Sequence, residues 1–103
     1  MNYTITARKF KLPEDQKAYM EEKIQKLTRF YDNILNMEII LGWEKLARYV
    51  ELKISVNQKP IVIKETSEDL RKSFDLAMDK AERQLKKHKS RHQDTENDII
   101  KSA

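Results

Sequence analysis

The chain contains no cysteine, one glycine and two prolines among its 103 residues. The lack of cysteine excludes a disulfide framework and thiolate chemistry, and it is common in proteins of the reducing cytoplasm. Because glycine and proline interrupt regular structure, their scarcity indicates helices and strands joined by short turns. No stretch approaches the ~20 apolar residues of a membrane-spanning helix, and residues 1–10 lack the layout of a signal peptide. We expect a cytoplasmic protein with no membrane partner.

Charged residues are abundant instead, at 37% of the chain against 39% hydrophobic residues. A chain of 103 residues is typical of one domain, so we expect one compact core beneath a highly ionic surface. The net charge of +4 favours a polyanionic partner only weakly. The distribution of the charge along the chain is therefore more informative than its sum.

Four segments have the pattern of β-strands. Residues 2–8, 36–44 and 50–56 alternate apolar with polar side chains, as half-buried strands do. A shorter apolar run at residues 61–63 predicts a fourth strand. The connections between the last three segments are short, which indicates antiparallel hairpins.

Two segments have the pattern of amphipathic helices. Residues 13–31 carry an apolar stripe at helical spacing. A second helix is predicted to open at Thr66 or Ser67, either of which can cap it, and its apolar pattern fades near Lys89. The order β-α-β-β-β-α predicts an α+β fold, a two-layer sandwich with both helices on one face of a four-stranded, mainly antiparallel sheet. We expect residues 1–90 to form this domain and residues 91–103 a mobile tail.

Basic side chains gather in the second half of the second predicted helix. Helical spacing places Lys80, Arg83 and Lys87 opposite the apolar stripe. On the first helix, cations alternate with aromatic residues along one flank, in the order Tyr19, Lys23, Lys26 and Phe30. Cations interleaved with aromatic rings suit RNA, whose phosphates attract charge and whose exposed bases can stack.

Ordinary surface chemistry explains part of the same pattern. Acids early and bases late in a helix complement its dipole, and pairs such as Asp79 with Arg83 fit exposed i, i+4 ion pairs. Tyr19 and Phe30 also fit the edge of a core. From the residues alone, a solvated surface and an RNA-binding surface both stay open.

Patterns for catalysis or metal binding are weak. His88 and His92 have a spacing that could bridge a metal, but the surrounding lysines and arginine would repel a cation. Gly42 lies inside a predicted strand, so there is no glycine-rich phosphate-binding loop. Asp75 and Asp79 share a helix face without further ligands. We predict no enzymatic activity, no metal, no cofactor and no small-molecule substrate.

Two segments resemble a known family. Residues 18–32 resemble the first helix of the bacterial ribosome hibernation-promoting factors and ribosome-associated inhibitors. Residues 74–89 resemble that family's signature helix, most specifically in the ending Asp-Lys…Glu-Arg-Gln-Leu-Lys-Lys-x-Lys. The similarity extends over about residues 1–90, with two departures: Ala7 leads into Arg8 and Lys9 where the family commonly has glycine, and Ala81 stands where a larger aliphatic residue is usual.

The resemblance implies a fold like that of double-stranded RNA-binding domains and docking in the decoding region of the small ribosomal subunit. There the protein would block mRNA and tRNA under stress or in stationary phase, touching rRNA and adjacent ribosomal proteins. The chain resembles the family's short form, a monomer when free. The residues implied to bind RNA are Lys23, Lys26, Arg29, Lys80, Arg83, Lys86, Lys87 and Lys89.

Two alternatives remain beside the ribosomal reading. The same fold could serve as a generic RNA-binding module for duplex or messenger RNA. It could instead serve as a protein-interaction domain that uses the outer face of the sheet, where we expect Ile40, Tyr49 and Val62 to be exposed.

Overall fold

The computed structural model describes residues 2–57 and 59–102, with side chains described as far as Lys87. Its elements follow the predicted order and confirm the α+β fold. They are β1 (Asn2–Ala7), α1 (Glu14–Phe30), β2 (Asn36–Glu44), β3 (Ala47–Ser55), β4 (Ile61–Ser67) and α2 (Leu70–Ser102).

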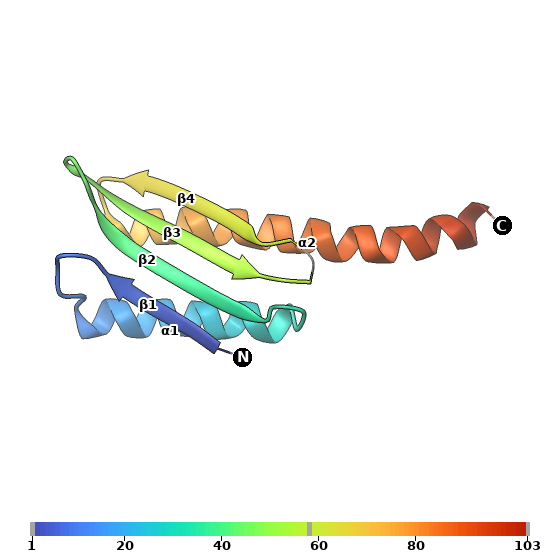
Figure 1. The fold of residues 1–103 in the computed structure, drawn as a ribbon, viewed down its shortest axis with the longest axis horizontal. Helices are drawn as coiled ribbons and strands as arrows, with labels where there is room; N and C mark the ends of the chain where they lie inside the picture. The colour runs from blue at the N-terminus through green and yellow to red at the C-terminus, as the bar shows by residue number, and fades with distance from the viewer. Residues whose placement is uncertain (1, 58, 103) are drawn as a thin grey trace.

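The four strands form one sheet in the order β1-β2-β3-β4. β1 runs parallel to β2, with α1 as the connection between them, and the other two pairs are antiparallel. Both helices lie on the same side of the sheet, and α2 packs on β3 and β4 (Figure 1). The mainly antiparallel two-layer sandwich is therefore as predicted.

The core lies between the sheet and the two helices. α1 contributes Met20, Ile24 and Leu27, which fall on one side of the helix and are buried. α2 contributes its own apolar stripe, in which Phe74, Ala81 and Leu85 are fully buried. The strands supply the alternate residues of β2, β3 and β4 that face the helices: Met37, Ile39, Leu41, Val50, Leu52, Ile54, Ile61 and Ile63.

The start of α2 differs from the prediction. β4 continues to Ser67, and the helix begins at Leu70. Asp69 is the cap, because its Oδ1 accepts a hydrogen bond of 3.1 Å from the backbone N–H of Arg71. The Ser67 hydroxyl instead accepts the Asp69 N–H at 3.2 Å and so stabilises the turn before the cap. The prediction of Thr66 or Ser67 as the cap was wrong, since the strand's pairing with β3 occupies both residues.

The end of α2 also differs from the sequence pattern. The helix extends to Ser102, well beyond Lys89, where the apolar periodicity fades. The side chains from residue 88 onward lie outside those described. The predicted mobility of residues 91–103 and the domain boundary near residue 90 therefore stay predictions.

The outer face of the sheet is less apolar than expected. Ile40 is only 4% exposed, so its predicted exposure was wrong, whereas Val62 is 59% exposed as expected. The Tyr49 ring lies over Gly42, where an added Cβ would come within 2.6 Å of it. The only glycine of the chain thus makes room for a tyrosine on the neighbouring strand.

Two charged pairs lie on this outer face. Lys64 Nζ lies 2.6 Å from Glu44 Oε2 and 4.9 Å from the centre of the Tyr49 ring. This contact with Glu44 raises the pKa of Lys64 above its usual value. Lys53 and Glu51 form a looser pair, with N and O 3.9 Å apart. A charged, hydrogen-bonding face of this kind is solvated by itself and does not require a protein partner.

Candidate nucleic-acid interface

Tyr19 joins α1 to α2 through its hydroxyl and its ring. Its hydroxyl donates a hydrogen bond of 2.7 Å to Asp75 Oδ1. Its ring packs edge-on against Phe74, with centroids 6.2 Å apart, and Arg71 lies 3.8 Å from its centre. The hydrogen bond to Asp75 raises the pKa of Tyr19, and partial burial adds to the effect. Tyr19 therefore fixes the two helices relative to each other, as the core-edge interpretation predicted, rather than offering a free ring for stacking.

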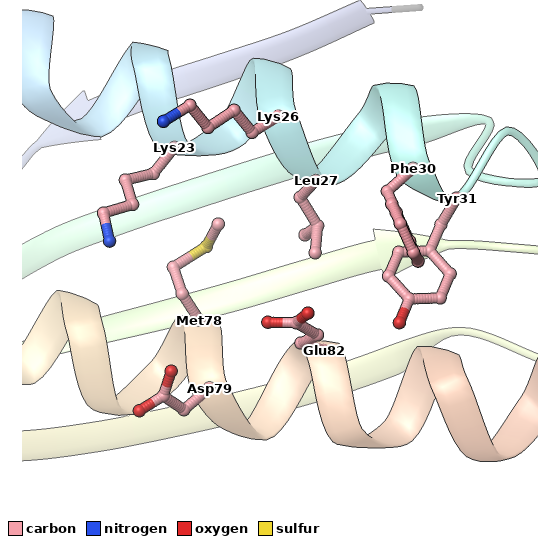
Figure 2. Close-up of a pocket in the computed structure, with 8 residues that line it drawn as sticks. All are labelled: Lys23, Lys26, Leu27, Phe30, Tyr31, Met78, Asp79 and Glu82. Atoms are coloured by element: carbon pink, nitrogen blue, oxygen red, sulfur yellow. The ribbon is translucent and has the colours of Figure 1, made fainter.

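A groove separates the two helices beyond this contact. Figure 2 shows its apolar floor, where Leu27 of α1 and Met78 of α2 point toward each other. Lys23 reaches from α1 toward α2, whereas Lys26 lies along its own helix (Figure 2). The groove is lined by Lys23, Lys26, Leu27, Phe30, Tyr31, Met78, Asp79 and Glu82.

The three predicted cations of α1 are all exposed at this groove or beside it. Lys26 pairs with Glu22 one turn away, at 3.6 Å, with both side chains about two-thirds exposed, at 65% and 68%. An ion pair in such a solvated position is weak and is readily exchanged for a phosphate. Arg29 and Lys26 line a shallow depression with Phe30, whose ring is 68% exposed. The structure thus brings together Lys23, Lys26 and Arg29 along one edge of the groove.

The predicted cations of α2 divide into two groups. Arg83 and Lys86 line a depression with Asp79 and Glu82, next to the groove, and Lys87 is exposed beyond them. Lys80 lies on the other flank of α2, where its Nζ is 2.5 Å from Glu65 Oε2 on β4. Glu65 is only 17% exposed, so this ion pair also holds α2 against the edge of the sheet. The side chain of Lys89 lies outside those described.

Two acids of α2 lie among the cations of the groove. Asp79 and Glu82 both line the groove on its α2 wall. The negative charge of Glu82 contributes, after burial, to raising the pKa of the Tyr31 hydroxyl. Helical spacing from Met78 could have located Glu82, because a residue four positions after a groove-lining residue lies on the same side of the helix. A polyanion is therefore attracted to the two edges of the groove and repelled from part of its α2 wall.

Two other kinds of site, a metal centre and a membrane-spanning helix, each require a particular arrangement of residues. Within residues 2–57 and 59–87, no group of three or more histidine or acidic side chains is arranged to hold a metal ion. In the same part of the chain, no helix has the length and apolar character needed to cross a membrane. What the arrangement offers is an electrostatic surface for a polyanion.

The fold and this surface define a class: a small α+β domain whose two sheet-covering helices present basic side chains along a shared groove. The chain belongs to the family described as Sigma 54 modulation protein / S30EA ribosomal protein, whose model matches residues 3–93. The resemblance found in the helices is thereby confirmed.

Individual relatives agree with this assignment. The ribosome hibernation promoting factor of Azotobacter vinelandii is 33% identical over 91 residues, covering 88% of this chain and 85% of that protein. The factor of the same name from Escherichia coli K12 is 28% identical, covering 88% of this chain and 96% of that protein.

Solved structures show the same fold. A ribosomal subunit interface protein from Coxiella burnetii matches with a TM-score of 0.80 at 28% identity, covering 87% of this chain and 99% of that one. The N-terminal domain of Thermus thermophilus Protein Y matches with a TM-score of 0.75 at 24% identity, covering 85% of this chain and 99% of that one. The second likeness supports the fold alone.

Proposed function

We propose that this protein is a ribosome hibernation factor that acts in the cytoplasm by binding, without catalysis. Its relatives carry the name ribosome hibernation promoting factor, and a structural neighbour is called a ribosomal subunit interface protein. We further propose that its target is rRNA in the decoding region of the small subunit. Bound there, it excludes mRNA and tRNA by occupying their place.

The observation that carries the RNA-binding part is the side-by-side position of the two basic helices. Lys23 and Lys26 on α1 line the same groove as Asp79 and Glu82 on α2, and these two acids share a second depression with Arg83 and Lys86. Cations from distant parts of the chain therefore lie at two adjoining depressions, with Asp79 and Glu82 between them. Phosphates on both edges of the groove would neutralise these cations and release counterions, which makes binding strongly dependent on salt.

Charge reversal on α2 tests this surface. Changing Arg83, Lys86 and Lys87 together to Glu is expected to weaken binding to purified small subunits at least tenfold. It should also reduce the salt slope by about two, since each neutralised phosphate contributes ~0.7 to 0.9. Lys80 is left unchanged, because Lys80→Glu would replace its ion pair with Glu65 by a repulsion between two carboxylates and destabilise the fold. Sedimentation of the complexes at several salt concentrations measures both quantities.

A matched control reverses three exposed lysines elsewhere, Lys17, Lys59 and Lys72, which line none of the depressions at the groove and form none of the described ion pairs. This control changes the net charge equally but should lose much less affinity. Equal losses in both triple variants would mean that only total charge matters, and the proposed surface would be wrong. If free duplex RNA competes as well as the subunit does, the protein is a general RNA-binding module instead.

A further inference from the structure

The loop after β1 and the turn between β2 and β3 both lie at the end of the molecule opposite to the C-terminus (Figure 1). Arg48, on β3, stands beside Trp43 of β2 in the register of the sheet. Its guanidinium carbon lies 3.6 Å from the centre of the Trp43 ring and 5.4 Å from that of Phe10, in the loop. We refer to Phe10, Trp43 and Arg48 as the Trp43 cluster.

The backbone of this cluster is held in place. The buried hydroxyl of Ser73, at the start of α2, donates a hydrogen bond of 2.8 Å to the carbonyl oxygen of Arg48. The N–H of Arg8 donates to the carbonyl of Leu41 at 2.8 Å and so fixes the start of the loop beside β2. The cluster is thus anchored to both layers of the fold and is preorganised for a ligand.

The contacts of Arg48 leave its hydrogen-bond donors available. A guanidinium carries five N–H groups in its plane, and an aromatic ring stacked on its face does not use them. No described carboxylate forms an ion pair with Arg48. The Trp43 side chain beside it is 49% exposed, which is unusual for the largest apolar side chain of a protein.

The surrounding charge is positive. Segments 8–13 and 43–48 together hold five cations and one acid. The acid, Glu44, is already paired with Lys64 at 2.6 Å. The four other cations are Arg8, Lys9, Lys11 and Lys45, all of them exposed.

We propose that the Trp43 cluster is a second RNA contact, separate from the groove between the helices. Arg48 binds a phosphate through its in-plane N–H groups, and the exposed indole of Trp43 packs against the neighbouring nucleotide. The inference rests on the RNA-binding part of the proposed function. RNA fits better than an acidic protein segment, because a phosphate next to a flat apolar base matches a guanidinium next to an indole.

Trp43 is the only tryptophan of the chain, so its fluorescence reports on this cluster directly. The test titrates the full chain with a single-stranded RNA of mixed sequence labelled with a dye. Dye anisotropy measures total binding, and Trp43 emission measures occupation of the cluster. We expect both signals to change together, and Arg48→Gln to weaken the Trp43 response about tenfold, as the loss of one charge-assisted hydrogen bond implies.

Thermal unfolding shows whether Arg48→Gln is still folded. Two further variants test the cluster if it is not. Lys9→Gln and Lys45→Gln remove charge without touching the rings, and each should reduce the salt slope of the Trp43 response by up to about one. Lys59→Gln, in the turn between β3 and β4, is the control and should leave that response unchanged.

Several results would overturn the proposal. If the dye anisotropy shows that RNA binds but Trp43 emission does not change, the RNA does not contact the Trp43 cluster. The groove between the helices would then be the only RNA contact proposed. Equal responses to RNA and to a poly-glutamate peptide would make the cluster a general anion site, as would saturation by inorganic phosphate alone. If RNA of any length produces neither signal, the inference fails even where the protein binds ribosomes through other contacts. Failure of the ribosome-binding assay with an intact Trp43 response would instead reject only the proposed function.

Discussion

At the scale of single residues, Tyr19 connects α1 to α2 through both its hydroxyl and its ring. Tyr19→Phe keeps the ring contacts with Phe74 and Arg71 but removes the hydrogen bond to Asp75. We expect the free energy of unfolding to fall by about 0.5–1.5 kcal/mol at neutral pH, the usual net value of one such bond. Urea unfolding measures the loss.

The pH dependence of this loss has a definite sign. The bond to Asp75 raises the pKa of Tyr19 in the folded protein above the ordinary value near 10. The stabilisation is therefore complete below about pH 10 and is lost as the pH rises through the higher folded pKa. The gap in stability between the wild type and Tyr19→Phe should narrow above pH 10. A gap that widens there would contradict this account of the contact.

Lys9 has an unfavourable backbone conformation. Its φ of 63° lies in the left-handed region, which glycine adopts without cost and other residues do not. Lys9 follows Ala7 and Arg8, at the end of the first strand, where the family that the chain resembles commonly has a glycine. Lys9→Gly should therefore stabilise the protein by up to about 1 kcal/mol, measured by urea unfolding. Lys11 lies in the same loop but has no positive φ, so Lys11→Gly should destabilise the protein. If both variants change the free energy of unfolding in the same direction, backbone conformation at Lys9 is not the cause.

At the scale of elements, the two acids on the α2 wall bear on the proposed approach of RNA to the groove, because they would repel phosphate. Asp79→Asn together with Glu82→Gln should strengthen RNA binding severalfold at low salt, because two like charges at the site no longer repel phosphate. The same changes at Glu14 and Asp15, at the start of α1, serve as the control. Fluorescence anisotropy with labelled RNA measures the difference. An effect no larger than that of the control would mean that RNA does not pass over the groove.

The regular elements could be predicted from the sequence because their side chains repeat with the period of the structure. Met20, Ile24 and Leu27 mark the buried side of α1 in the sequence as plainly as in the fold. The end of β4 could not be predicted, because residues after Ile63 alternate without apolar side chains and only pairing with β3 keeps them extended. For the same reason the cap was predicted at Thr66 or Ser67 instead of Asp69, where the structure has it.

Contacts between helices and strands could not be predicted from the sequence. A helical projection places Lys80 with Arg83 and Lys87, but only the packing of α2 on β4 shows that Glu65 lies beside Lys80. Likewise Ile40 alternates as an outward-facing residue, yet it is buried. The aromatic and cationic residues of the Trp43 cluster come from two segments more than thirty positions apart, so no local pattern indicates them.

At the scale of the whole molecule, the proposed function is inhibition by occupation of space on the small subunit. The two helices cover one face of the sheet (Figure 1) and present cations along their groove, while the opposite face of the sheet carries the Lys64–Glu44 and Lys53–Glu51 pairs. Binding is therefore expected to be one-sided, with the helices toward rRNA. Inhibition of translation then needs no chemistry and should be fully reversed by high salt, which releases the protein.

The most direct test is a competition on purified small ribosomal subunits. A labelled mRNA and an initiator tRNA are bound first, and the protein is then added in increasing amounts at low salt. The account predicts that both labels are released as the protein binds, and that the Arg83, Lys86 and Lys87 triple variant releases them only at much higher concentration. Simultaneous binding of protein, mRNA and tRNA to the same subunit would contradict occlusion of the decoding region.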